Sequence, residues 1–233
     1  MMLRSVCLWH DTTARNGPMN MAVDEVLLRG AEKPWLRFYR WSEPSVSIGF
    51  SQDYEAVAKQ LPAYPVVRRW TGGGVVVHES DWTYTLIVPR QDPVCELRPV
   101  ETYRRIHEAL ISALHQSGSD GCALQPESTS DGRGVCFVEP AQFDVMRDGV
   151  KIAGAAQRRS KLGFLHQASV QQVVLPQDFG FALARELAEE IEVVTQSDAE
   201  SQVLAEAQAL AVRRYGTSSW LHHRREETEA TSP

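Results

Sequence analysis

Residues 68–78 read RRWTGGGVVVH, so three consecutive glycines lie between an arginine pair and a histidine. Consecutive glycines lose much chain entropy on folding, which indicates that the backbone needs positive φ or the room left by a missing Cβ. The N–H groups of such a loop could receive an oxyanion, and an arginine fork could neutralise a phosphate or a carboxylate. Because strand residues alternate between faces, only one of Arg68 and Arg69 can line such a site. Taken alone, the glycines favour a hairpin turn, and their spacing matches neither the dinucleotide-binding nor the P-loop motif.

A second stretch with possible chemistry, residues 149–159, reads GVKIAGAAQRR. Lys151 directly follows an expected turn and enters an apolar strand, from which its ammonium could reach into a cleft as a fixed positive charge. A lone lysine of this kind is more often solvated. Gly154 and the two alanines after it indicate a crowded backbone, close to a ligand or to another strand.

The elements that must position these residues follow from hydrophobic periodicity and turn signals. Helices are expected over residues 16–30, 100–118, 181–191 and 199–216, and strands over residues 35–41, 45–50, 65–70, 74–78, 82–89 and 164–176. A hairpin is expected to turn at Asp148-Gly149, and residues 127–134 read as an exposed loop. The pattern predicts an α+β fold with a mixed, largely antiparallel sheet. We expect one domain over residues 1–221, a frayed tail over residues 222–233, and no C-terminal accessory domain.

Composition narrows the class of protein. The chain has 233 residues, 43% of them hydrophobic and 23% charged, which is typical of a globular domain. A net charge of −6 gives no support for a nucleic-acid partner. We expect no membrane span and no signal peptide, and hence a cytoplasmic protein with reduced thiols. No CxxC pair is present, so no metal site is expected.

Five stretches in chain order resemble the lipoate–protein ligase A and octanoyltransferase family, which is related to biotin protein ligases. They are NMAVDEVLL, LRFYRWSEPSVSIGFSQ, VVRRWTGGGVVVHESDWTYTLIVP, GVKIAGAAQRR and RRYGTSSWLHHR. The third carries the most specific signature, Arg-Arg-x-Ser/Thr-Gly-Gly-Gly-x-Val-x-His. The GRGRxxxxW-type loop of biotin ligases is absent from the sequence, which makes a biotin ligase the weaker interpretation.

The resemblance implies a biotin/lipoate ligase-like catalytic domain, with helices around the sheet and a cleft for an eight-carbon acyl chain. It implies an amide product on the lysine of a lipoyl domain, such as those of 2-oxoacid dehydrogenases or the glycine cleavage H protein. Lys151 would stabilise the acyl carbonyl or a phosphate, which suits acyl transfer because negative charge develops on the carbonyl oxygen. The substrate-binding residues that it implies are Arg69, Gly72, Gly73, Gly74, His78 and Gly154.

Two mechanisms are open on this scaffold. A ligase would use ATP, Mg²⁺ and free lipoate, and would pass through an acyl-adenylate; this is our main expectation. An octanoyltransferase would need no cofactor and would take octanoyl from an acyl carrier protein. VCFVEPAQFDVMRDGVKIAG resembles the branch of transferases in which a cysteine, here Cys136, forms a thioester. A buried structural cysteine is the ordinary alternative.

One departure from the family concerns the strand over residues 164–176. The family usually has Gln-His-Gly there, whereas this chain has His166-Gln167-Ala168. If the glycine is needed for close approach of the acyl chain, Ala168 narrows the pocket. This leaves a third alternative, a catalytically impaired protein that binds lipoyl domains without modifying them.

Overall fold

A computed structural model of the 233-residue chain describes residues 1–127 and 140–226. Cys136 and nearly all of the loop expected at residues 127–134 lie outside the described residues. The strands are β1 (Leu3–His10), β2 (Trp35–Tyr39), β3 (Ser45–Ile48), β4 (Val66–Arg68), β5 (Val75–His78), β6 (Trp82–Pro89), β7 (Cys122–Leu124), β8 (Val145–Arg147), β9 (Val150–Ser160), β10 (Gly163–Val170) and β11 (Ala188–Val193). The helices are α1 (Gly17–Gly30), α2 (Tyr54–Gln60), η1 (Pro93–Glu96), α3 (Pro99–Gln116), α4 (Phe179–Leu187), α5 (Gln196–Leu210), η2 (Ala211–Tyr215) and α6 (Ser218–His223).

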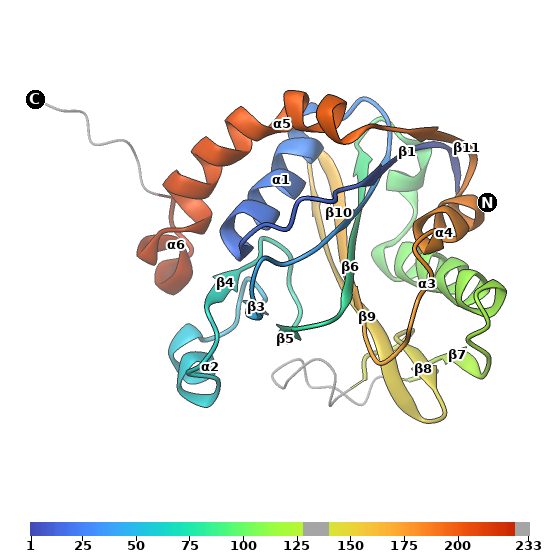
Figure 1. The fold of residues 1–233 in the computed structure, drawn as a ribbon, viewed down its shortest axis with the longest axis horizontal. Coiled ribbons are helices and arrows are strands. Elements are labelled where there is room, and N and C mark those ends of the chain that lie inside the picture. The colour runs from blue at the N-terminus through green and yellow to red at the C-terminus, as the bar shows by residue number, and fades with distance from the viewer. Residues whose placement is uncertain (128–139, 227–233) are drawn as a thin grey trace, which may run out of the picture.

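The main sheet has eight strands in the order β11-β1-β2-β6-β10-β9-β8-β7 (Figure 1). β1 pairs in parallel with β11 and β2, and the other neighbours pair antiparallel. The expected α+β fold with a mixed, largely antiparallel sheet is confirmed. A second sheet, in the order β4-β3-β5, stands beside it and carries the arginine and glycine segment.

Side chains along the central strands point alternately to the two faces of the main sheet, and each face has its own apolar core. Tyr84, Leu86 and Val88 of β6 pack with the apolar faces of α3 and α4. Ile87 points the other way and packs with α1 and α5. Figure 1 shows these helix pairs on opposite sides of the sheet. The period of two along the strand therefore gives a three-layer arrangement.

The C-terminal third differs from the sequence prediction. The helix expected over residues 181–191 ends at Leu187, and Ala188–Val193 forms β11, which pairs in parallel with β1. Alanine and glutamate favour a helix here, but pairing with a distant strand outweighs that local preference. The strand expected over residues 164–176 ends at Val170, and Gln172 adopts a φ of 58°. Neither β1 nor the short helix α2 was expected.

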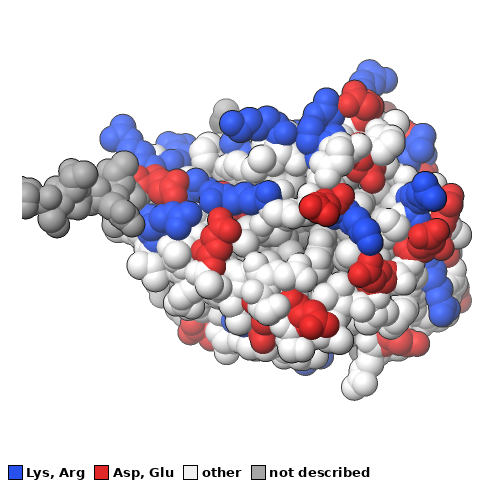
Figure 2. Space-filling view, turned by 90° about the horizontal axis from the view of Figure 1, so that it is seen from above, with Lys and Arg blue, Asp and Glu red and all other residues white. Residues whose placement is uncertain are grey.

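The hairpin between β8 and β9 turns where the sequence predicts. Asp148 and Gly149 have φ values of 51° and 79°, and positive φ at both central residues is typical of a type I′ turn. The helix α6 continues to His223, beyond the domain end expected at residue 221. Figure 2 shows acidic and basic side chains interspersed on the face seen from above in Figure 1. Among the described residues no helix is long and apolar enough to cross a membrane.

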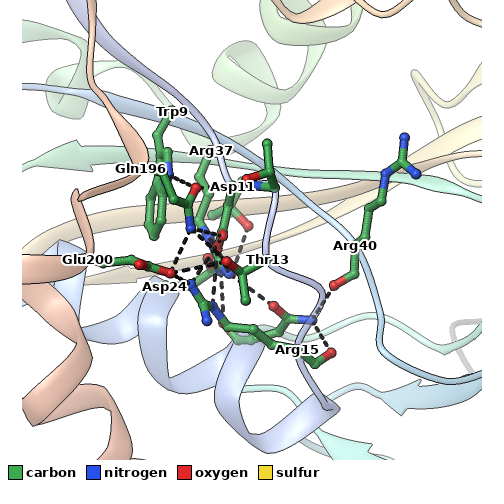
Figure 3. A network of polar contacts seen from close by, with 12 residues as sticks. Trp9, Asp11, Thr13, Arg15, Asp24, Arg37, Arg40, Gln196 and Glu200 are labelled. Carbon is green, nitrogen blue, oxygen red and sulfur yellow. Dashed lines mark hydrogen bonds and ion pairs between the residues drawn. The ribbon is translucent and has the colours of Figure 1, made fainter. Parts of the chain in front are cut away.

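Buried charges link β1, β2 and α1 (Figure 3). Arg37 Nη2 lies 2.7 Å from Asp11 Oδ2, and its Nη1 lies 2.8 Å from Asp24 Oδ1; all three side chains are 0% exposed. Arg15 joins the group through Asp11 and, at 2.6 Å, through Glu200 of α5. Charges removed from water in this way are tolerated only when each is paired. The network therefore fixes α1 and α5 against the sheet.

We predict that Arg37→Leu lowers the free energy of unfolding by about 3–5 kcal/mol, because it leaves buried carboxylates without their shared partner. Urea titration followed by circular dichroism measures this loss. The matched control is Arg90→Leu, which removes the exposed pair with Glu96 and is expected to leave stability nearly unchanged. Equal losses in the two variants would contradict a structural role for the buried network.

Candidate active site

A cavity that is partly open to solvent lies where the small sheet faces β6, β9 and β10, and its empty space, including the part open to solvent, is about 470 Å³. Its walls are mainly apolar and aromatic with a few polar groups, which is the usual character of a small-molecule site. The lining residues are Met21, Tyr39, Trp41, Ser47, Arg69, Val76, His78, Thr83, Lys151, Gly154, Ala155, Ala156, Gln167, Ala168 and Ser169. Four of the predicted site residues, Arg69, His78, Lys151 and Gly154, are among them.

The three glycines lie beside the cavity and do not line it. A Cβ added to Gly73, which has a φ of 80°, would lie 3.3 Å from the Cβ of Ala156 in the cavity wall. A Cβ on Gly49 would lie 1.9 Å from the carbonyl oxygen of Gly73, so Gly49 is also required for the loop to approach β3. The close approach explains why glycine occupies both positions.

The carbonyl groups of the glycine loop, residues 71–74, are turned toward the protein. The Thr71 carbonyl accepts from Phe50 N at 2.8 Å, and the Gly73 carbonyl accepts from Gln52 Nε2 at 3.3 Å. Arg69 Nη2 donates to the carbonyls of Gly72 and Gly74 at 3.0 and 2.9 Å. The Gly74 carbonyl also accepts from Gly49 N at 3.1 Å. Within residues 1–127 and 140–226, the N–H groups of Gly72 and Gly73 have no acceptor. Both groups can thus donate to a ligand.

The two adjacent arginines have different partners, as strand alternation predicts. Arg69 lines the cavity and donates to the backbone oxygen and the hydroxyl of Ser47 as well as to the glycine loop. Arg68 points away and donates to carbonyls of residues 49, 50, 52 and 221. Both guanidinium groups therefore order the backbone, and Arg69 does so from within the cavity wall.

Lys151 forms a buried ion pair at the cavity wall. Its Nζ lies 2.7 Å from Asp144 Oδ2, and the side chains are 5% and 1% exposed. Asp144 also accepts from the hydroxyl of Tyr103 at 2.5 Å and from the N–H of Ala141 at 2.7 Å. Burial, reinforced by Asp144, raises the pKa of Tyr103 well above its ordinary value, so the hydroxyl remains a donor. The ammonium is held in one place beside the apolar space.

Gly154 makes room for this lysine. A Cβ at position 154 would lie 2.6 Å from Lys151 Cε and 2.8 Å from Nζ. The lysine side chain therefore crosses directly over the glycine on the same strand. This explains the Lys-x-x-Gly spacing in physical terms.

His78 is fixed on three sides. Its Nδ1 lies 2.8 Å from Asp81 Oδ2, its Nε2 lies 2.7 Å from Ser47 Oγ, and its ring stacks on Trp41 with centroids 4.0 Å apart. Asp81 Oδ2 also accepts from Thr83 at 2.8 Å and Ser169 at 2.6 Å. Burial alone would raise the pKa of Asp81, but His78 and these hydroxyls outweigh it and lower that pKa.

The His166-Gln167-Ala168 segment lies in β10. Ala168 is 3% exposed and its methyl group forms part of the cavity wall. Gln167 accepts from Thr71 Oγ1 at 2.7 Å and donates to Asp24 Oδ2 at 2.8 Å, so it connects the glycine loop to the buried charges of Figure 3. Burial, with a smaller contribution from His107, lowers the pKa of His166 well below its ordinary value, which keeps that ring neutral.

Sequence reasoning missed the positioning roles of the residues that hold the predicted ones in place, namely Ser47, Thr71, Asp81, Tyr103, Asp144 and Gln167. Asp144 had a detectable signal, because the Asp-Gly turn brings it opposite the β9 segment that contains Lys151. The others meet their partners through tertiary contacts between separate elements, as Thr71 and Gln167 do across 96 positions. Periodicity carries no information on such contacts.

We predict that Gly154→Ala displaces the Lys151 ammonium from Asp144 without unfolding the chain, because only the flexible end of a side chain must move. Labelling of Lys151 by an amine-reactive reagent, read by peptide mass spectrometry, should rise by about tenfold, which corresponds to a loss of roughly 1.4 kcal/mol of pairing. Gly72→Ala is the control, since its Cβ would meet no atom within 4 Å. Unchanged labelling in the Gly154 variant would refute the close-approach argument.

Comparison with known proteins gives relatives for most of the chain. The model of the lipoyl protein ligase A/B catalytic domain matches residues 16–200. An octanoyltransferase LipM of Staphylococcus epidermidis is 33% identical over 184 residues, covering 71% of this chain and 66% of the relative. An octanoyltransferase LipM of Geobacillus kaustophilus is 33% identical over 203 residues, covering 80% of this chain and 72% of that relative. The first match thus spans slightly less than two thirds of that relative's length.

Solved structures share the fold at lower identity. A T. acidophilum protein described as a lipoate protein ligase, with bound lipoic acid, has a TM-score of 0.71 at 24% identity and covers 95% of this chain and 100% of its own. Lipoate-protein ligase A bound with ATP has a TM-score of 0.72 at 23% identity, with coverages of 95% and 99%. A bipartite lipoate protein ligase from Thermoplasma acidophilum, solved in a study with its E2 lipoyl domain, has a TM-score of 0.60 at 21% identity, with coverages of 98% and 100%. The sequence matches and the shared fold show that the chain belongs to the lipoyl protein ligase A/B catalytic domain family.

Proposed function

We propose that this chain transfers an octanoyl group from an acyl carrier protein to the lysine of a lipoyl domain. The observation that carries the proposal is the buried Lys151–Asp144 pair, which holds a cation against a largely apolar cavity. An acyl chain gains about 0.8 kcal/mol for each methylene that it buries, and its polar carbonyl needs a charged partner at the cavity wall. The relatives named octanoyltransferase LipM favour this transfer over the ligase reaction that was our main expectation.

The reaction proceeds in two acyl transfers. The thiolate of Cys136 attacks the octanoyl thioester, the bond to the carrier sulfur breaks, and the carrier thiol leaves with the proton that Cys136 lost. The amine of the target lysine then attacks the Cys136 thioester, which forms the amide, and the amine's proton passes to the departing Cys136 sulfur. Cys136 lies outside the described residues, so its role rests on sequence alone.

The residues around the cavity stabilise the charge that develops in both steps. Each tetrahedral intermediate carries an oxyanion on the former carbonyl oxygen, and a fixed ammonium with preorganised N–H donors lowers its energy. Lys151 supplies the ammonium, and Gly72 and Gly73 supply the N–H groups. Asp144 keeps Lys151 in place, while the apolar walls, including Trp41 and Ala168, hold the acyl chain.

The partners follow from this reaction. The acceptor is a lipoyl domain of a 2-oxoacid dehydrogenase or a glycine cleavage H protein, and the donor is an acyl carrier protein. The proposal is supported by the LipM relatives and by the fold shared with a ligase studied with its E2 lipoyl domain. A single catalytic domain that includes α6 and a cytoplasmic location, where thiols stay reduced, fit the same chemistry.

The acyl-adenylate ligase remains the second candidate. It is favoured by the N–H groups of Gly72 and Gly73, which could receive the phosphate of an adenylate as well as a carbonyl oxygen. ATP with Mg²⁺ would supply the activation of a free acid in that case. In the part of the chain that the structure describes, no three His, Cys, Asp or Glu side chains gather to hold a metal ion. Mg²⁺ with a nucleotide is commonly held by the phosphates and one or two carboxylates.

The test incubates the protein with apo lipoyl domain and either octanoyl-acyl carrier protein or lipoate with MgATP, and reads the intact mass of the lipoyl domain. We expect a mass gain only with the carrier thioester. Cys136→Ala and Lys151→Ala should abolish it, whereas Cys95→Ser, the control at another free cysteine, should retain it.

Each other result would contradict the two-step transfer through Cys136. A mass gain only with MgATP supports the ligase, and octanoylation that persists in Cys136→Ala excludes the thioester route. Binding of the lipoyl domain without any mass gain supports the impaired binder.

A further inference from the structure

A continuous chain of hydrogen bonds runs from the far wall of the cavity to the glycine loop. Asp81 bonds to His78, His78 to Ser47, and Ser47 to Arg69 at 2.7 Å. Arg69 then donates to the carbonyls of the glycine loop at 2.9 and 3.0 Å. The side chains of His78 and Asp81 are 4% and 3% exposed, and Ser47 is 1% exposed.

The donor and acceptor roles along the chain are determined by its two ends. The Asp81 carboxylate can only accept, so His78 donates through Nδ1. The Arg69 guanidinium can only donate, so it occupies a lone pair of Ser47 Oγ and leaves the hydroxyl proton available for His78 Nε2. One arrangement of donors and acceptors satisfies every bond of this chain Asp81–His78–Ser47–Arg69, which we call the relay, and a fully satisfied network is rigid.

We propose that Asp81 is a positioning residue of the acyl-transfer site: through His78 and Ser47 it fixes Arg69, and Arg69 fixes the glycine loop. Asp81 is not among the residues that line the cavity, and its hydrogen bonds go to His78, Thr83 and Ser169. Its effect on the reaction is therefore indirect. By holding the loop carbonyls inward, the relay leaves the N–H groups of Gly72 and Gly73 available to a bound acyl group.

The order Ser47, His78, Asp81 also suits a serine nucleophile, and the contacts disfavour that role. Ser47 Oγ is held by Arg69 and His78 together, and the residue lies inside a strand that pairs on both sides. A nucleophile must leave such contacts to reach a carbonyl, whereas a relay needs them to persist. The geometry therefore favours positioning.

Two substitutions of His78 separate the relay from simple packing. His78→Gln keeps one donor and one acceptor but loses the stack on Trp41. His78→Phe keeps the stack but loses both hydrogen bonds. Asp81→Asn removes the charge and replaces one of the two acceptor oxygens with a donor, which weakens the acceptor that orients the ring. Glu79→Gln, at an exposed neighbour bonded to Tyr64, is the matched control for the change of charge.

The first measurement is amide hydrogen exchange of Gly49 and Phe50, whose N–H groups donate to the loop carbonyls of Gly74 and Thr71, and it does not depend on any activity. The relay predicts exchange about tenfold faster in Asp81→Asn and His78→Phe, because the loop opens more often. His78→Gln and Glu79→Gln should remain close to the unsubstituted protein. Fast exchange in His78→Gln with protection in His78→Phe would show that the stack fixes the loop and would overturn the proposal.

The second measurement is octanoyl transfer and rests on the proposed function. Asp81→Asn should lower kcat by about tenfold to a hundredfold with little change in KM, since the loop acts on the transition state. An octanoyl ester on Ser47, found by peptide mass spectrometry, would overturn the positioning role. If the unsubstituted protein transfers no octanoyl group, the proposed function fails, and hydrogen exchange still decides whether the relay exists.

Discussion

The ion pair between Lys151 and Asp144 is the interaction on which the rest of the site depends. An ammonium beside an apolar cavity is costly unless a counter-charge and further hydrogen bonds compensate for lost hydration. Asp144 supplies the charge at 2.7 Å, and Tyr103 and the N–H of Ala141 satisfy its oxygens. Gly154 leaves the space through which the lysine passes. The β8–β9 hairpin, with its register shift at Val145/Met146, brings Asp144, Lys151 and Gly154 together, and α3 contributes Tyr103.

The small sheet supplies the opposite half of the site. Its strands β3, β4 and β5 hold the glycine loop with the carbonyls turned inward, and Arg69 joins two of those carbonyls to Ser47. Gln167 connects the same loop to Asp24 and thus to the buried charges around Arg37. The cation comes from one sheet and the N–H donors from the other. The distance between the two sheets therefore sets the size of the acyl group that can contact both.

Local signals in the sequence were enough for much of this arrangement. Helical periodicity located α1 and α3, and the Asp148-Gly149 pair located the hairpin that carries Lys151. The ordered motifs indicated the family, and strand alternation separated the role of Arg68 from that of Arg69. These features depend on residues within a few positions of one another.

The features that were missed depend on contacts between distant segments. β11 contains residues that favour a helix, and it becomes a strand by pairing with β1, as in Leu3 with Ala188. Asp81 and Ser47 are ordinary polar residues until His78 lies between them. Residue spacing along one strand does not specify such contacts.

The most direct test of the central claim is a crystal structure of the protein with octanoate. We predict that the acyl chain of octanoate lies between Trp41 and Ala168. One of its carboxylate oxygens should lie within about 3 Å of Lys151 Nζ, the distance of a charge-assisted hydrogen bond. A carboxylate bound at Ser47 and His78 instead, or octanoate bound outside the cavity, would contradict the account.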